Sequence, residues 1–117
     1  MCTKAQLNEI TDKITASAKE TLGDKLRNVI LYGSYARGDY NEDSDVDIMV
    51  LADIENEDAF TLGRPIRRVA GKIELENDMF ISVQLKNRDF FNEWKETLPF
   101  YRNVINDGII LYEKQLI

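Results

Sequence analysis

The sequence predicts an α/β (α+β) domain with a small mixed sheet of about four strands and helices packed on one side. Amphipathic segments alternate with short apolar runs, and glycines, prolines or polar loops separate them. Strands interleaved with helices in this way are typical of helices layered on a sheet. At 117 residues the chain has room for one core, so residues 1–117 are predicted to form a single domain.

The first predicted element is a long amphipathic helix from Lys4 to Leu22. Thr3 is followed three residues later by Gln6, which is the pattern of a capping box at a helix start. Gly23 marks the predicted end of the helix. One face carries apolar residues at helical spacing: Leu7, Ile10, Ile14, Ala18 and Leu22.

Two strands are predicted to follow, joined by a polar connection. Asn28–Tyr32 is a short apolar run that stops at a glycine, which indicates a buried strand. Ser34–Gly38 is predicted to form one or two helical turns, and Asp39–Asp43 a polar loop. Ser44–Leu51 alternates well enough to predict the second strand.

The middle of the chain predicts a helix and a third strand. Asp53–Leu62 is acidic and predicts a loop with a helical turn. Pro65 begins a second amphipathic helix that ends near Asn77. Met79–Leu85 predicts the third strand, because its apolar residues alternate.

The last third of the chain predicts two short helices and a final strand. Asn87 is expected to cap a helix that carries Phe90, Phe91 and Trp94. Pro99–Asp107 predicts a further helix ended by Gly108, and Ile109–Tyr112 the last strand. The aromatic residues here favour a core or partner surface over a base-stacking platform: Phe90, Phe91, Trp94, Phe100 and Tyr101.

The composition narrows the chemistry that the chain can perform. It contains no histidine, which excludes serine–histidine and cysteine–histidine nucleophiles and histidine-ligated zinc. Catalysis would have to rest on carboxylates, hydroxyls, lysine or arginine, and bound metal. The net charge of -6 disfavours a general nucleic-acid binder, which needs a basic face.

The cellular compartment of the protein is predicted from its N-terminal segment, its hydropathy and its cysteine content. The N-terminal segment lacks the apolar stretch of a signal peptide, and no apolar run is long enough to span a membrane. Cys2 is the only cysteine, so an internal disulfide is excluded and a reducing compartment is favoured. Together these features predict a cytoplasmic protein with no membrane association.

The segment from Val29 to Leu51 carries the most specific chemical signal. Gly33 and Ser34 offer bare backbone and a hydroxyl at a strand-to-helix turn, where the β and γ phosphates of a nucleoside triphosphate can be held. Asp45 and Asp47 stand two residues apart on a predicted strand, so both carboxylates point to one face. Such a pair can hold Mg²⁺ against the triphosphate, and a second ion would activate an attacking hydroxyl.

These residues resemble a known family. Residues 33–50 follow the pattern G-S-x-A-R-G-x5-S-D-x-D-x-x-V of the DNA polymerase beta nucleotidyltransferase superfamily at every defined position. The length and element order are similar to its smallest branch, the minimal nucleotidyltransferases. The resemblance implies the nucleotidyltransferase fold over nearly the whole chain.

The resemblance also implies roles for individual residues. Gly33 and Ser34 match the family's phosphate-binding pair, and Asp45 and Asp47 match its two metal-binding carboxylates. Arg37 and Ser44 match motif positions close to the nucleotide. The family commonly uses a third acidic residue on a later strand as metal ligand or base. By placement this would be Asp78, with Glu74 and Glu76 as competitors.

A partner is implied as well. Minimal nucleotidyltransferases are commonly paired with a helical HEPN protein in modules resembling toxin–antitoxin systems, where they transfer AMP from ATP to a tyrosine of the partner. The resemblance therefore implies a Mg²⁺-dependent protein adenylyltransferase that acts as antitoxin, with two ions expected. Two alternatives stay open: a non-enzymatic antitoxin or regulatory subunit that inhibits by binding, and a small-molecule nucleotidyltransferase that works as a homodimer.

Overall fold

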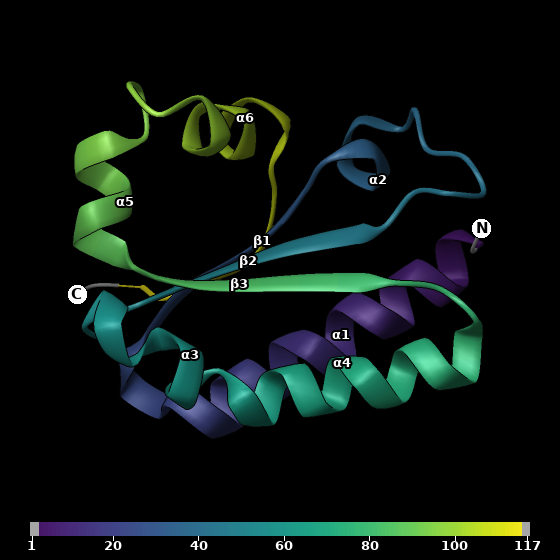
Figure 1. Ribbon diagram of the computed structural model, residues 1–117, viewed down its shortest axis with the longest axis horizontal. Coiled ribbons are helices and arrows are strands. Elements are labelled where there is room, and N and C mark those ends of the chain that lie inside the picture. Colours follow the sequence, from purple (N-terminus) through teal and green to yellow (C-terminus); the bar gives the residue numbers. More distant parts are fainter. Residues whose placement is uncertain (1–2, 116–117) are drawn as a thin grey trace.

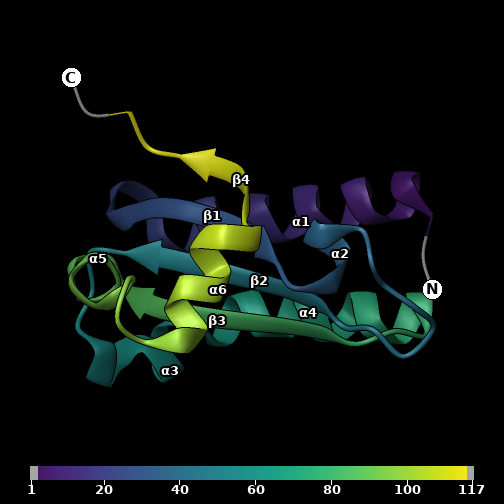
Figure 2. The same cartoon turned by 90° about the horizontal axis from the view of Figure 1, so that it is seen from above.

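The computed structural model describes residues 3–115, so Cys2 lies outside the described residues. Four strands form one sheet in the order β3-β2-β1-β4 (Figure 2). β1 is antiparallel to β2 and β4, whereas β2 and β3 are parallel, so the predicted mixed four-stranded sheet is confirmed. The strand bounds are β1 Leu26–Tyr32, β2 Val46–Ala52, β3 Ile81–Asn87 and β4 Ile109–Glu113.

The two long helices lie side by side over one face of the sheet, below it in Figure 1. α1 spans Lys4–Leu22 and α4 spans Arg64–Asn77, close to their predicted bounds. The capping box between Thr3 and Gln6 is present, and its two hydrogen bonds measure 2.8 and 3.1 Å. Ile14 and Ile66 are fully buried between these helices and the sheet, and they centre the larger hydrophobic core.

The opposite face of the sheet is also partly covered, which the predicted one-sided arrangement did not include. α5 (Arg88–Trp94) and α6 (Pro99–Asp107) lie above the sheet in Figure 1, and the short α2 (Ser34–Arg37) lies beside them. β2 is apolar on both faces at its far end, and a strand of that kind needs cover on both sides. A second core fills this space, made by Tyr32, Met49, Leu51, Phe91, Tyr101 and Val104.

Two strand starts differ from the predicted ones in a way that affects the site. The second strand begins at Val46 rather than Ser44, and the third at Ile81 rather than Met79. Asp45 therefore lies just ahead of β2 rather than within it, and Asp78 ends α4 instead of directly preceding the third strand. The acidic segment 53–62 contains a short 3₁₀ turn, Asn56–Asp58, and the one-turn helix α3, Ala59–Leu62.

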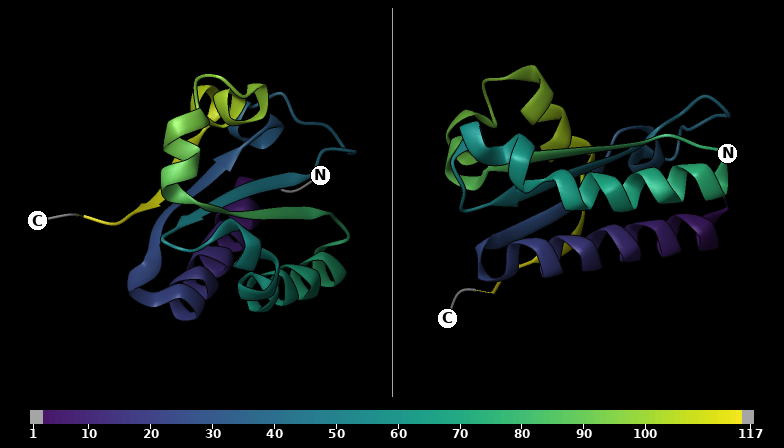
Figure 3. Two further views of the ribbon diagram at one scale, coloured as in Figure 1. Left: turned by 60° about the vertical axis from the view of Figure 1, so that its left-hand side comes forward. Right: turned by 60° about the horizontal axis from the view of Figure 1, so that its bottom comes forward.

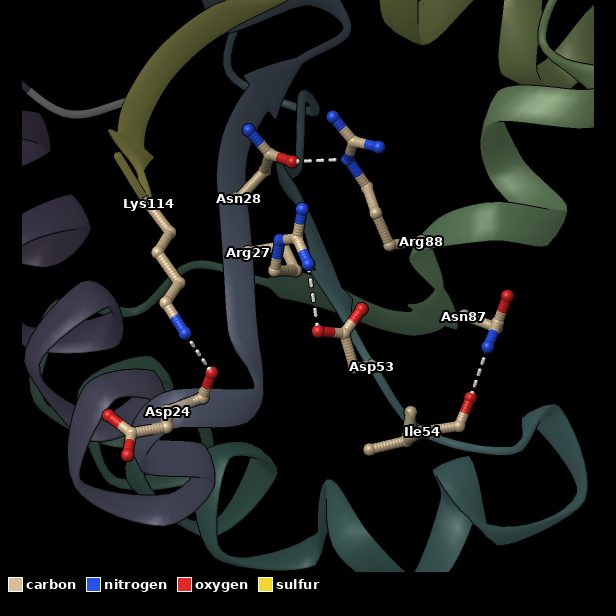
Figure 4. Close-up of polar contacts among 8 residues, drawn as sticks. All are labelled: Asp24, Arg27, Asn28, Asp53, Ile54, Asn87, Arg88 and Lys114. Carbon is tan, nitrogen blue, oxygen red and sulfur yellow. Dashed lines mark hydrogen bonds and ion pairs between the residues drawn. The ribbon is translucent and has the colours of Figure 1, made fainter. Parts of the chain in front are cut away.

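Polar contacts join neighbouring segments at the end of the sheet that lies away from Gly33 (Figure 4). Arg27 forms a 2.9 Å ion pair with Asp53, and Arg88 Nε donates to the Asn28 side chain over 2.7 Å. The side chain of Asn87 caps α5 by accepting a 2.7 Å hydrogen bond from the Phe90 N–H, as predicted. Within residues 3–115, none of the helices is both long and apolar enough to cross a membrane.

Candidate active site

The turn after β1 brings backbone into contact with a carboxylate. Gly33 adopts φ 78° and ψ -159°, a conformation that side chains other than glycine rarely allow. A Cβ at this position would lie 2.4 Å from Asp47 Oδ2, far inside van der Waals contact. Glycine is therefore required both by the backbone and by the approach of Asp47, and the predicted turn and aspartate meet.

α2 continues this turn and fixes the position of Ser34. The Ala36 and Arg37 amides donate to the Gly33 carbonyl over 3.1 and 3.0 Å, and the Gly38 amide donates to the Ser34 carbonyl over 2.9 Å. Gly38 then ends the helix in the left-handed conformation. Ser34 is the first residue of α2 and is half-buried, directly beside the glycine that contacts Asp47.

Asp47 pairs with Tyr32 across the two central strands, at the end of β2 nearest the turn. Burial is the main cause that raises the pKa of Asp47 above its ordinary value, and the negative charge of Asp45 raises it further. Arg37 opposes both effects only in part. The two carboxylates are therefore close enough to repel, and one of them is poorly hydrated.

A divalent cation fits this donor set. Carboxylate oxygens are ligands that Mg²⁺ prefers, and a cation between two repelling carboxylates relieves both their repulsion and the desolvation of Asp47. Asp45 is exposed and Asp47 is half-buried, so the pair opens to solvent on one side. Asp45 and Asp47 are the residues that would hold the ion.

Ser44 shapes the loop that leads into this pair. Its hydroxyl accepts a 2.9 Å hydrogen bond from the Asn41 amide, and its own amide donates to the Asn41 carbonyl over 3.1 Å. The Asn41 side chain in turn accepts from the Asp43 amide over 2.8 Å. Ser44 thus stabilises the loop through its hydrogen bonds with Asn41, and its predicted contact with the nucleotide stays a prediction.

Arg37 lies at the end of α2 and is ion-paired. Its guanidinium contacts Asp39 at 3.0 Å and Asp107, the last residue of α6, at 2.8 Å. The hydrogen bond to Asp39, followed by that to Asp107, raises the pKa of Arg37. The contact with Asp107 links α2 to α6 across 70 residues of sequence.

None of the three candidates for a third carboxylate forms a metal-binding group with Asp45 and Asp47 within residues 3–115, so the predicted role of Asp78 stays a prediction. Asp78 ends α4 in the left-handed conformation and lines a cavity of about 180 Å³ that Asp45 and Ser44 also line. Glu74 lies on α4 and accepts a hydrogen bond from the Ile81 amide, and Glu76 is exposed on the same helix. Among residues 3–115, no three acidic side chains come close enough to share a metal ion.

Three residues beside the pair were missed by sequence reasoning. Ser82 lies next to Asp47 in the parallel register of β2 and β3. Tyr32 packs edge-on against Phe100 of α6, with ring centroids 5.7 Å apart, and Phe100 remains 45% exposed. Burial, together with the charge of Asp47, raises the pKa of the Tyr32 phenol. Only the strand register and the docking of α6 reveal these neighbours, because neither leaves a local signal in the sequence.

Sequence comparison finds relatives over most of the chain. Residues 12–116 match the family described as “Polymerase beta, Nucleotidyltransferase”. A Methanocaldococcus jannaschii protein named “Putative protein adenylyltransferase” is 34% identical over 88 residues, which cover 75% of this chain and 80% of the relative.

Comparison with solved structures finds the same fold. A chain in the crystal structure of a toxin–antitoxin with AMP-PNP aligns over 90% of this chain and 74% of its own, with a TM-score of 0.56 and 23% identity. Spectinomycin adenyltransferase AAD(9) from Enterococcus faecialis, crystallised with ATP and spectinomycin, aligns over 92% of this chain and 56% of its own. Its TM-score is 0.66 and its identity 12%. Likeness at these identities concerns the fold.

Proposed function

The chain belongs to the polymerase beta nucleotidyltransferase family, and from that premise we propose that it transfers AMP from ATP to a hydroxyl of a partner protein. In this reaction the acceptor oxygen bonds to the α-phosphorus while the bond from that phosphorus to the bridging oxygen breaks. Pyrophosphate and one proton are released. The acceptor we propose is a tyrosine of a HEPN-type helical protein, whose toxicity the modification would suppress.

The observation that carries this proposal is the contact between Gly33 and Asp47. A Cβ at Gly33 would lie 2.4 Å from Asp47 Oδ2, so the turn and the carboxylate are built against each other. Phosphate oxygens held at the turn would then lie beside the carboxylate pair. This proximity is what a nucleotidyl transfer needs, because such catalysis consists mainly of positioning and charge stabilisation.

In this proposal, phosphate binding and metal binding fall to different residues of the chain. Gly33 and Ser34 would bind the β and γ phosphates, through backbone N–H groups and the hydroxyl. Asp45 and Asp47 would hold Mg²⁺, which when bound neutralises phosphate charge and lowers the pKa of a coordinated hydroxyl. Arg37 is within electrostatic reach of Asp47, and exchanging Asp107 for a phosphate would turn it towards the nucleotide.

Within residues 3–115 no third carboxylate joins Asp45 and Asp47, so we expect the acceptor protein to complete the site. Ser82, and not an acid, lies beside Asp47 on the neighbouring strand. On the α6 side, Phe100 packs against Tyr32, the neighbour of Asp47, and is 45% exposed. A protein partner would close this side and exclude water from the reacting groups. The Methanocaldococcus relative, named “Putative protein adenylyltransferase”, also supports a protein acceptor.

The experiment combines the purified chain, the product of the neighbouring gene, Mg²⁺ and ATP labelled at the α-phosphate. We expect label on the partner, and we expect Asp45→Asn and Asp47→Asn to reduce transfer by roughly a hundredfold or more. Asp58→Asn is the matched control, because it makes the same change at an exposed position at the other end of the sheet. Absence of label, with inhibition of the partner that survives both substitutions, would show a non-enzymatic antitoxin instead.

A further inference from the structure

One side of α4 has no cover from any other described element. The helix buries Ile66, Ala70 and Ile73 against α1 and the sheet. Figure 3 (right) shows α4 beside α1 with its outward side free. The positions on that side, which we call the α4 outer face, are Arg64, Arg68, Gly71 and Leu75.

The most exposed large apolar side chains of the described chain lie at the two ends of this helix. Leu75 is 88% exposed and Phe80, just after the helix, is 73% exposed. Phe60, on α3 just before the helix, is 72% exposed. A groove of about 330 Å³ lies against Leu75 and Phe80. Leu75 and Phe80 line this groove together, and contiguous exposed apolar side chains of this kind mark interaction sites.

The charges of α4 are separated along its length. Residues 64–72 carry Arg64, Arg67, Arg68 and Lys72 and no acid, whereas residues 73–78 carry Glu74, Glu76 and Asp78 and no base. The ion pairs found among residues 3–115 use other charges. A second α4 running in the opposite direction would set each basic half against an acidic half. This arrangement is self-complementary, as a two-fold contact requires.

Gly71 marks the place where two such helices would cross. Glycine weakens a helix relative to alanine, and a Cβ here would meet no atom within 4 Å, so nothing inside the molecule requires glycine. A second backbone approaching at this point would require it. With the crossing at Gly71, Arg64 lies level with Asp78 of the other copy, and Arg68 lies level with Glu74 of the other copy.

We propose that two copies of this chain associate through their α4 outer faces, as an antiparallel helix pair that crosses at Gly71. The 14-residue helix is about 21 Å long, so the contact is at the small end of specific interfaces. The dimer is therefore weak and salt-sensitive. It sets Arg64 of one copy beside Asp78 of the other, at the rim of the cavity that Asp45 lines.

Sedimentation velocity of the chain alone, from about 10 µM to about 1 mM, tests this inference without nucleotide or partner. The result is thus independent of the proposed function. We expect a concentration-dependent dimer that weakens in high salt. Leu75→Glu should raise the dissociation constant at least tenfold without unfolding the protein, because the side chain it replaces is 88% exposed.

A charge exchange tests the antiparallel register. Arg64→Glu/Arg68→Glu replaces the basic members of the two expected pairs by acids, and Glu74→Lys/Asp78→Lys replaces the acidic members by bases. Each double variant alone should stay monomeric, and an equal mixture should form a heterodimer. Lys95→Glu/Arg102→Glu, a matched double charge change at the end of α5 and on α6, should dimerise like the wild type.

Three results would overturn the inference. A wild-type chain that stays monomeric at about 1 mM would show that the α4 outer face does not bind a second copy. Dimerisation unchanged by Leu75→Glu would place the interface elsewhere. A mixture of the two charge variants that associates no better than each variant alone would contradict the antiparallel pairing.

Discussion

Replacing Gly33 by alanine should damage both the fold and the site, by amounts that the structure allows us to separate. At φ 78° and ψ -159° a residue other than glycine costs about 1–3 kcal/mol in backbone strain. The new Cβ would also lie 2.4 Å from Asp47 Oδ2, so the carboxylate must rotate away, at a cost of about 0.5–1.5 kcal/mol. Together the two effects should lower the free energy of unfolding by about 2–4 kcal/mol.

Thermal and urea denaturation measure this loss. A chain of 117 residues has an unfolding entropy of roughly 250 cal/mol/K, so each kcal/mol lowers the melting temperature by about 4 °C. Gly33→Ala should therefore melt roughly 8–16 °C below the wild type. Gly38→Ala is the control: Gly38 has φ 88°, but a Cβ there meets nothing within 4 Å. It should lose only about 1–2 kcal/mol.

A double-mutant cycle isolates the contact with Asp47. In an Asp47→Ala background the carboxylate is gone, so Gly33→Ala should cost only the backbone strain, and the coupling energy should be about 0.5–1.5 kcal/mol. If Gly33→Ala costs the same in both backgrounds, the close approach of turn and carboxylate is not the reason for glycine. The central geometric premise of the site would then be refuted.

Three further predictions concern single side chains. Because burial and Asp45 raise the pKa of Asp47 above 3.8, the folded protein binds this proton more tightly than the unfolded chain does. Proton binding by Asp47 stabilises the folded protein at low pH, and this stabilisation is lost as the pH rises through the pKa of Asp47 in the folded state. In EDTA, Asp47→Asn should therefore raise the melting temperature near neutral pH. A decrease there would refute this reasoning. Thr3→Ala removes the capping box and should lower the free energy of unfolding by about 1 kcal/mol, or the melting temperature by about 4 °C. An unchanged melting curve would mean that the cap does not contribute to stability. Arg37→Ala breaks ion pairs that solvent reaches, so the melting temperature should hardly change. ATP affinity, measured by calorimetry, should fall about tenfold or more if the guanidinium moves to phosphate, and an unchanged affinity would exclude that contact.

Local signals predicted the elements closely. The predicted bounds of α6 match the observed Pro99–Asp107, because proline at its start and glycine after its end are local determinants. Asn87 was predicted as a cap from its position alone, and its side chain does accept the Phe90 N–H. The meeting of the Gly33 turn with Asp47 was also expected, because two short strands joined by a short loop tend to be neighbours in a sheet.

What the sequence could not predict depends on contacts between distant segments. Ser82 lies beside Asp47 only because β2 and β3 are parallel in one particular register, and register is set by tertiary packing. The pairing of Arg37 with Asp107 spans 70 residues and depends on how α6 docks. Asp78 was expected at a strand start, but it ends α4 in the left-handed conformation, which delays the strand by two residues.

The central claim is that the Gly33 turn and the two carboxylates form one site for a metal-bound nucleotide. Isothermal titration of a non-hydrolysable ATP analogue, with Mg²⁺ and then with EDTA, measures it most directly. We predict Mg²⁺-dependent binding that Asp45→Asn and Asp47→Asn weaken at least tenfold and that Asp58→Asn leaves intact. Binding of equal strength in EDTA, or in both carboxylate variants, would contradict the claim.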